Sequence, residues 1–167
     1  ADFSQNFQAV RWLMGNLDVS GYETILWALP LLMASLAGFT YLPRSLNLLT
    51  LGTEYAATRG VDVLKTQRVA FLSASLATGA AVSLGGPIGF IGIIVPHIVR
   101  LLVGADHRVV LPSATFLGAA FLVTCDIGAR TIMAPVELPV GVLTAMLGGP
   151  SFLWLLTRTR EDRTGVN

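Results

Sequence analysis

Residues 69–99, VAFLSASLATGAAVSLGGPIGFIGIIVPHIV, contain no Asp, Glu, Lys or Arg. The hydrocarbon core of a bilayer is about 30 Å thick and takes roughly 17–25 predominantly apolar residues per helix. This stretch is therefore too long for one ordinary span and long enough for two short ones. Gly85, Gly86 and Pro87 lie near its middle and favour a break between two helices.

The whole chain has the composition of an integral membrane protein. Of its 167 residues, 53% are hydrophobic and 13% are charged, and the mean hydropathy is +0.69. Soluble domains carry about 25% charged residues. This composition excludes an ordinary soluble enzyme and a disordered tail. The net charge of +1 also lacks the basic excess of a nucleic-acid-binding protein, so we expect no nucleic-acid partner.

The predicted fold is an all-α integral membrane domain that covers residues 1–167. We expect about five transmembrane helices, with short interfacial and cytoplasmic helices between or before them. The predicted spans are 24–42, 69–85, 88–103, 110–127 and 139–157.

The placement of basic residues predicts the orientation of these spans. With five spans, the loops 43–68, 100–110 and 157–167 share one side of the membrane. Those loops hold Arg44, Arg59, Lys65, Arg68, Arg100, Arg108, Arg158, Arg160 and Arg163, whereas the other side holds Arg11 and Arg130. Because Lys and Arg concentrate in cytoplasmic loops, we expect the C-terminus in the cytoplasm and the N-terminus outside.

Two polar segments flank the first span. Residues 1–20 have a loosely helical apolar spacing, which fits either an amphipathic helix at the outer interface or the end of a truncated span. The chain has no basic start or cleavage site, so it does not read as a signal peptide and instead looks like a piece of a longer chain. Residues 48–63 can form a short helix that stops at Gly60, with a second helix start at Val61-Asp62, and this segment is either a solvated connection or a docking element.

The small residues of 70–92 also leave two interpretations open. They suit close helix packing in any polytopic protein, and they suit the broken helices that line transport pathways. On the second interpretation, the pathway or helix-break residues are Gly85, Gly86, Pro87, Gly89 and Pro96.

The chain lacks the common motifs of catalysis and nucleotide binding. It has no G-x-x-x-x-G-K-[ST], no H-E-x-x-H and no G-x-S-x-G. The single Cys125 excludes a cysteine metal site. We expect His97 to be packed or interfacial and His107 to be solvated. The sequence therefore predicts a protein that is not an enzyme and that binds no metal or cofactor itself.

Several motifs, in order and correctly spaced, resemble those of the FecCD family of ABC importer permeases. They are GPIGFIGIIVPHIVR at 86–100, Asp106-His-Arg with Leu111-Pro112, Ala129-Arg130 with ELPVG at 137–141, GGPSFLWLL at 148–156, and RSLNLLTLG at 44–52 followed by Glu54 and residues 56–60. The resemblance covers nearly the whole chain.

The resemblance implies an importer with several components. A family subunit has ten spans, so this chain would be its C-terminal half. It would lie in lipid in a prokaryotic plasma (inner) membrane and pair with a second permease subunit, as a homodimer or heterodimer. Cytoplasmic ABC ATPase subunits would bind ATP and Mg, and a substrate-binding protein would deliver the cargo. The expected cargo is a ferric siderophore, with haem or vitamin B12 as alternatives.

The same resemblance implies roles for individual residues. The cytoplasmic segment 43–68 would contain the ATPase-coupling residues: Leu51, Gly52, Glu54, Ala56, Arg59 and Gly60. Glu54 and Arg59 would make polar contacts, whereas Leu51, Ala56 and Gly60 would allow close packing. Arg130 would dock the binding protein through a carboxylate, although it can instead pair with Asp126 at i, i+4 spacing.

Two other classes of function remain as alternatives. A secondary carrier or channel needs no ATPase, but no ionisable residue lies in the middle of a predicted span, which disfavours a proton- or sodium-driven carrier. A membrane scaffold that binds partners without transport is the third class.

Overall fold

The computed structural model describes residues 3–17, 21–132 and 138–164. Within these ranges the chain forms helices and no strand. Glu137, which belongs to one of the quoted motifs, lies outside them. The helices are α1 Phe3–Leu13, α2 Tyr22–Tyr41, α3 Pro43–Leu49, α4 Thr53–Thr58, α5 Val63–Gly85, α6 Ile91–Val103, α7 His107–Thr131 and α8 Val140–Thr164.

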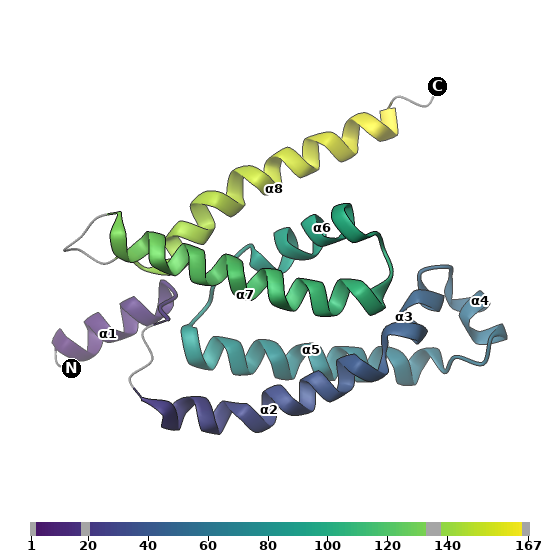
Figure 1. The fold of residues 1–167 in the computed structure, drawn as a ribbon, viewed down its shortest axis with the longest axis horizontal. Helices are drawn as coiled ribbons and strands as arrows, with labels where there is room; N and C mark the ends of the chain where they lie inside the picture. Colours follow the sequence, from purple (N-terminus) through teal and green to yellow (C-terminus); the bar gives the residue numbers. More distant parts are fainter. Residues whose placement is uncertain (1–2, 18–20, 133–137, 165–167) are drawn as a thin grey trace.

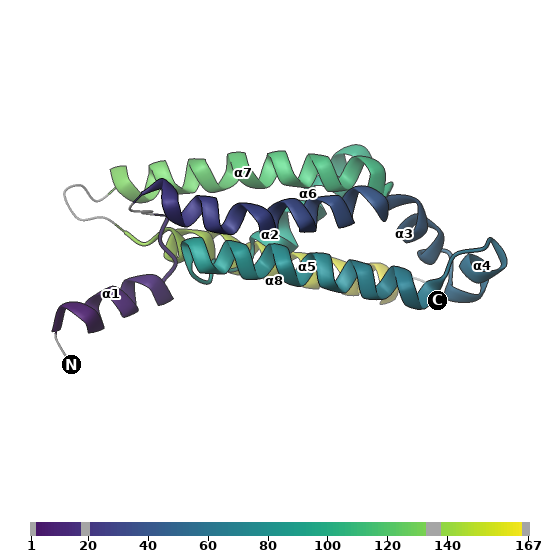
Figure 2. The ribbon, with the colours of Figure 1, turned by 90° about the horizontal axis from the view of Figure 1, so that it is seen from below.

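Figures 1 and 2 show the long helices lying roughly along one axis, with the short helices at the ends. Helices α2 and α5 pack side by side, while α6, α7 and α8 pack on one another. Helices α3 and α4 lie at one end, next to the start of α7, and α1 lies at the other end. A cavity of about 770 Å³ lies between α2 and the α6–α7 pair, lined by apolar residues such as Phe39, Ile91 and Val95.

Three of these helices are long and apolar enough to cross a bilayer: α2, α5 and α7. Helix α6 and the segment Val140–Leu153 of α8 are apolar but shorter. At 1.5 Å per residue, the 13 residues of α6 rise only about 20 Å. The all-α membrane fold is therefore as predicted, and the prediction of five spans is approximate.

The uncharged stretch 69–99 is divided between two helices. Helix α5 ends at Gly85, and Gly86 follows with a left-handed backbone at φ 70°. Pro87 cannot donate a backbone hydrogen bond, and it disfavours helical geometry at the residue before it. Helix α6 begins at Ile91.

Pro96, grouped above with the pathway or helix-break residues, lies inside α6, which runs from Ile91 to Val103 within the predicted span 88–103. A proline removes one backbone hydrogen bond, here to the carbonyl of Gly92, four residues earlier. In apolar surroundings the remaining backbone groups have no better partner than the helix, so the helix persists.

Small residues hold α2 against α5. The side chains buried on this pair include Ala28 and Ser35 of α2 and Ser73 and Ala80 of α5. The Ser35 hydroxyl donates to the Ser73 carbonyl at 2.8 Å, and a side chain at Gly38 would collide with Ser73. Close approach of this kind is how helices associate without a hydrophobic driving force.

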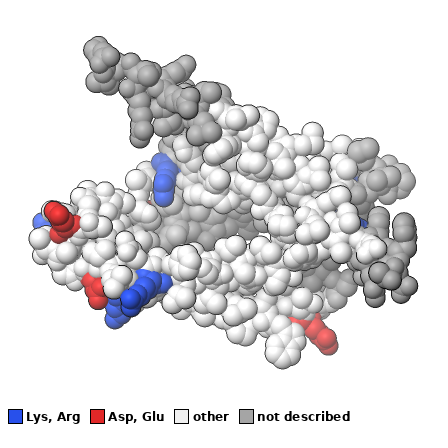
Figure 3. Space-filling model, turned by 180° about the vertical axis from the view of Figure 1, so that it is seen from behind, with Lys and Arg blue, Asp and Glu red and all other residues white. Residues whose placement is uncertain are grey.

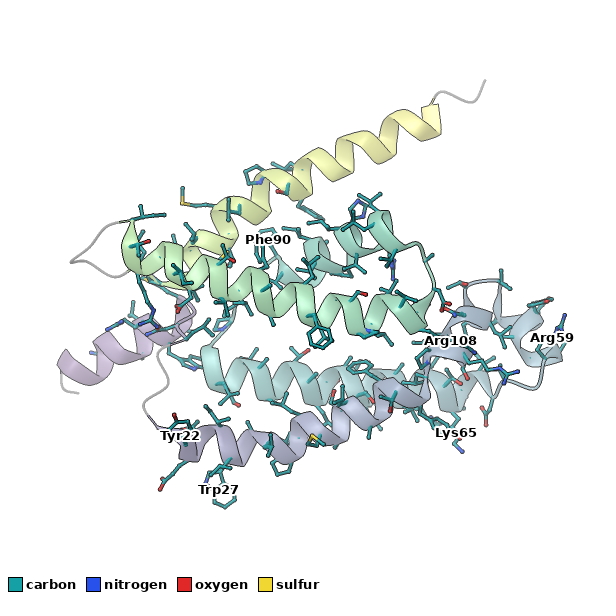
Figure 4. All side chains as sticks on the ribbon, viewed as in Figure 1. Tyr22, Trp27, Arg59, Lys65, Phe90 and Arg108 are labelled. Atoms are coloured by element: carbon teal, nitrogen blue, oxygen red, sulfur yellow. The ribbon has the colours of Figure 1, made fainter. Side chains whose placement is uncertain are left out.

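Phe90 fixes the start of α6 against α8. Among the described residues, Phe90 is the only residue other than glycine with a left-handed backbone, at φ 67°. Bulky residues adopt this conformation only when their surroundings impose it. Its side chain packs on Gly148 of α8, where a Cβ atom would collide with the ring (Figure 4). This contact explains the need for glycine at position 148.

Glycines also join three segments at the α1 end. The turn after α1 is tied to α5 by Asn16 N–H donating to Gly85 O at 2.9 Å, and to α8 by Gly141 N–H donating to Gly15 O at 3.4 Å. A Cβ atom at Gly141 would collide with the carbonyl of Met14. The backbone of this turn therefore occupies the space that a side chain at 141 would need.

We predict that Gly141→Ala destabilises the protein by about 1–3 kcal/mol, the usual cost of overpacking. The cause is the collision with Met14, whose backbone cannot rotate away. The measurement is the thermal unfolding midpoint in detergent. Gly149→Ala is the control in the same helix, because nothing lies within 4 Å of a Cβ atom there. Equal midpoints for the two variants would contradict this packing.

Candidate functional site

The most polar part of the described surface lies at the end of the molecule that carries α3 and α4. Figure 3 shows basic and acidic side chains gathered at this end, while uncharged surface covers most of the long helices. Helix α3 follows α2 directly, because Leu42 ends one helix and begins the other. Helix α4 leads into α5 through Gly60 and Asp62, whose carboxylate accepts from Lys65 N–H at 3.0 Å. The α3–α4 segment is thus carried by the α2–α5 pair.

Within residues 48–63, the stop at Gly60 and the second helix start at Val61-Asp62 are as predicted, but the helix expected before Gly60 is divided in two. Helix α3 ends at Leu49 and α4 begins at Thr53. Gly52 has φ 115°, a backbone that L side chains rarely adopt, so it reverses the chain between the two helices. Gly60, at φ 79°, ends the second helix near the predicted position.

The predicted coupling residues differ in how the structure presents them. Leu51 is 66% exposed in the turn between the two helices, and Glu54 and Arg59 are also exposed. The Arg59 guanidinium lies over the Tyr55 ring at 5.3 Å and donates to its hydroxyl at 3.0 Å. Ala56, which was expected to allow close packing, is completely buried. It packs inside the segment because the chain folds back over it at the α4–α5 turn.

A cavity of about 620 Å³ opens beside this segment. Four basic residues line it, Arg44, Arg59, Lys65 and Arg108, together with one acidic residue, Asp62. Figure 4 shows Arg59, Lys65 and Arg108 at this end of the molecule, on three different elements. The cavity is therefore suited to anionic groups.

Asn47, which the sequence analysis did not single out, joins α3 to the start of α7. Its side-chain Nδ2 donates to Asp106 Oδ1. Its Oδ1 accepts from His107 N–H at 2.9 Å and lies 2.7 Å from His107 Nδ1. The prediction of a solvated His107 is therefore wrong, since the residue is half-buried and bonded. An Asn in a helix carries no signal for a partner about 60 residues away.

Asp106 caps α7 and is stabilised in its charged form. Its carboxylate accepts from Arg108 N–H at 2.9 Å. This backbone bond, followed by the bond from Asn47, lowers the pKa of Asp106 below its ordinary value. The contact is therefore made by a carboxylate at neutral pH.

At the opposite end, Arg130 pairs with Asp126. The Nε–Oδ2 distance is 2.9 Å, at i, i+4 on α7. Arg11, Asn16, Leu138 and Pro139 line a small hollow with this pair. Of the two interpretations of Arg130 left open above, the structure contains the local pair, with 41% of the arginine side chain exposed.

The described residues hold no group of three or more His, Cys, Asp and Glu side chains placed to bind a metal ion. His97 is half-buried on α6.

Comparison with known proteins identifies the family. Residues 1–158 match the model of the FecCD transport family. The chain belongs to this family. Together with its apolar helices, membership makes the chain a multi-pass membrane protein.

Relatives in the FecCD family with assigned substrates differ in what they carry. The chain is 46% identical over 165 residues to the hemin transport system permease protein HmuU of Yersinia pestis. It is 48% identical over 155 residues to the cobalamin import system permease protein BtuC of Halobacterium salinarum. It is 44% identical over 152 residues to the Fe(3+) dicitrate transport system permease protein FecD of Escherichia coli.

The matches extend over 99%, 93% and 91% of this chain but only 49%, 41% and 48% of those relatives. A solved structure of a metal-chelate type ABC transporter in an inward-facing conformation superposes with a TM-score of 0.79 at 35% identity, over 95% of this chain and 51% of that one. The chain thus spans about half the length of these relatives.

We predict that Asp106→Ala lowers the thermal midpoint at pH 7, whereas Asp106→Asn keeps most of the stability because Asn is an equally good N-cap. A lowered pKa means that the carboxylate stabilises the fold fully above its ordinary pKa. That contribution is lost as the pH falls through the lowered value, below about pH 4. The difference between wild type and Asp106→Ala should therefore shrink in acid. A difference that stays constant down to about pH 2 would contradict this assignment.

Proposed function

We propose that this chain forms the C-terminal half of the permease subunit of an ATP-driven importer in a prokaryotic plasma membrane. The observation that carries the proposal is the family match over residues 1–158. The chain itself is not an enzyme on this proposal, and ATP is hydrolysed by separate partner subunits. The other half of the subunit and a second copy or relative of it complete the pathway, which works by alternating access.

The α3–α4 segment is the docking element for the ATPase. It projects at one end of the apolar helices, and its exposed residues include Leu51, Glu54 and Arg59. The basic residues around it support a cytoplasmic position for this end, because Lys and Arg concentrate in cytoplasmic loops. Movement of the ATPase on binding ATP would then act directly on α2 and α5, because α3 and α4 continue from them.

The cargo is a metal chelate, and we propose a ferric siderophore before haem or vitamin B12. The three named relatives carry hemin, cobalamin and ferric dicitrate at nearly equal identities to this chain. Overall identity in this half therefore does not discriminate between substrates. On the proposal, a separate binding protein supplies much of the selectivity.

The test of the proposed function is co-purification of the full-length permease with its ATPase in detergent. We expect capture by the wild type and loss of capture in Gly60→Trp, where a large side chain enters the open, left-handed turn between α4 and α5. Gly60→Asn is the matched control, because Asn tolerates this backbone conformation. Membrane insertion should be equal in all three proteins.

If the folded wild type captures no ATPase, the proposed function is refuted in favour of a secondary carrier or channel. Capture that survives in Gly60→Trp would refute the docking role of the segment.

Arg130 is proposed to meet a carboxylate of the binding protein. We expect Arg130→Glu to slow capture of the binding protein on the order of tenfold at low salt, and less at high salt, because rim charges act mainly through steering. Asp126→Asn/Arg130→Glu controls for local repulsion between two carboxylates on one helix face. It should lose capture equally. Unchanged capture at low salt, measured by surface plasmon resonance, would refute this role.

A further inference from the structure

The described helices form two groups that must move together if the segment at one end is to act on the whole subunit. The first group is the α2–α5 pair, and the second is α6, α7 and α8. The cavity of about 770 Å³ lies between α2 and the second group. At the end opposite α1, the contact that crosses from one group to the other is that of α3 with the start of α7.

Asn47 makes this contact specific because it uses both ends of its amide. Its Nδ2 donates to the carboxylate of Asp106, and its Oδ1 accepts from the backbone N–H of His107. When Nδ1 of His107 carries a hydrogen, the ring donates to the same oxygen at 2.7 Å. Two hydrogen bonds, and a third when Nδ1 of His107 carries the hydrogen, thus join one side chain of α3 to two consecutive residues at the start of α7.

These bonds also complete the cap of α7. The first N–H groups of a helix have no partner within the helix. Here the Asp106 side chain, in the loop before α7, accepts a hydrogen bond from Arg108 N–H. The Asn47 side chain, on α3, accepts one from His107 N–H. The first turn of α7 is therefore built partly from the α3–α4 segment, so displacement of α3 breaks the cap unless α7 follows.

Helix α7 can carry such a displacement across the molecule. It is continuous from His107 to Thr131, and its 25 residues rise about 37 Å. Its far end carries the Asp126–Arg130 pair, and it packs on α6 and α8 along the way.

We propose that Asn47 is a positioning residue that transmits the movement of the α3–α4 segment to α7, so that the α6–α8 group follows the α2–α5 pair. This inference rests on the proposed function, because the movement is supplied by a bound ATPase. Without the bonds of Asn47, motion of the segment would move α2 and α5 but would not move α6, α7 and α8.

The chemistry of the contact provides a test by exchange. Asn47→Asp places a carboxylate against Asp106 and removes the donor, so repulsion between two carboxylates replaces the bond to Asp106. Asn47→Asp/Asp106→Asn reverses the bond, because the amide introduced at position 106 donates to the carboxylate introduced at position 47, which still accepts from His107. Asn remains a good cap for α7. If Asn47 acts through its bond to position 106, transmission of the movement to α7 is therefore lost in the single variant and restored in the double variant.

The experiment uses the full-length permease with its ATPase in liposomes. A cysteine replaces exposed Thr131 at the far end of α7 in a permease whose other cysteines, Cys125 included, are changed to Ser. Its labelling by a membrane-impermeant maleimide is timed with and without ATP and vanadate. We expect a several-fold nucleotide-dependent change in rate with Asn47, loss of that change in Asn47→Asp, and recovery in the double variant. Capture of the ATPase should be equal in all three.

Asn47→Ala removes the bonds without adding charge and serves if Asn47→Asp does not assemble. Loss of assembly in both variants would assign Asn47 a purely structural role and overturn the inference. A nucleotide response that is absent from an assembled wild type, or that persists in Asn47→Asp, would also overturn it. A wild type that captures no ATPase would instead refute the proposed function.

Discussion

The close approach of α2 and α5 is the constraint on which the arrangement of the chain depends. Between two helices in an apolar environment there is no hydrophobic driving force, so association relies on backbone proximity and short hydrogen bonds. Gly38 and Ser73 supply the proximity, and Ser35 supplies a hydrogen bond at 2.8 Å. Because α3 follows α2 and α4 leads into α5, this pair also determines where the polar α3–α4 segment lies.

The two ends of the molecule join the helix groups by different chemistry. At the α1 end, backbone atoms of the last turn of α1 and of the residues after it lie where side chains at Gly86 and Gly141 would be, and backbone hydrogen bonds also hold this junction. At the other end, Asn47 bonds to Asp106 and His107 across a polar surface. The first junction is made by backbone atoms, whereas the second depends on polar side chains of α3 and of the residues at the start of α7.

Sequence reasoning identified the α3–α4 segment but not how each residue is used. Exposed Leu51, Glu54 and Arg59 remain available to a partner, whereas Ala56 turned out to be fully buried. Burial of a small residue depends on how the chain folds back over it, and a local pattern does not report that. For the same reason Asn47 was missed: its partners are distant in the sequence and only the packing of α3 on α7 brings them together.

The sequence by itself determined the class of the protein: helical, embedded in a membrane, with a helix break near Gly86 and a family signature along nearly the whole chain. These properties follow from composition, run length and ordered motifs, all of which are local or additive. Tertiary structure decided the rest. It buried Ala56 inside the α3–α4 segment and brought Asn47 of α3 to Asp106 and His107. Each of these outcomes depends on which groups the fold brings within bonding distance, and that is a property of packing.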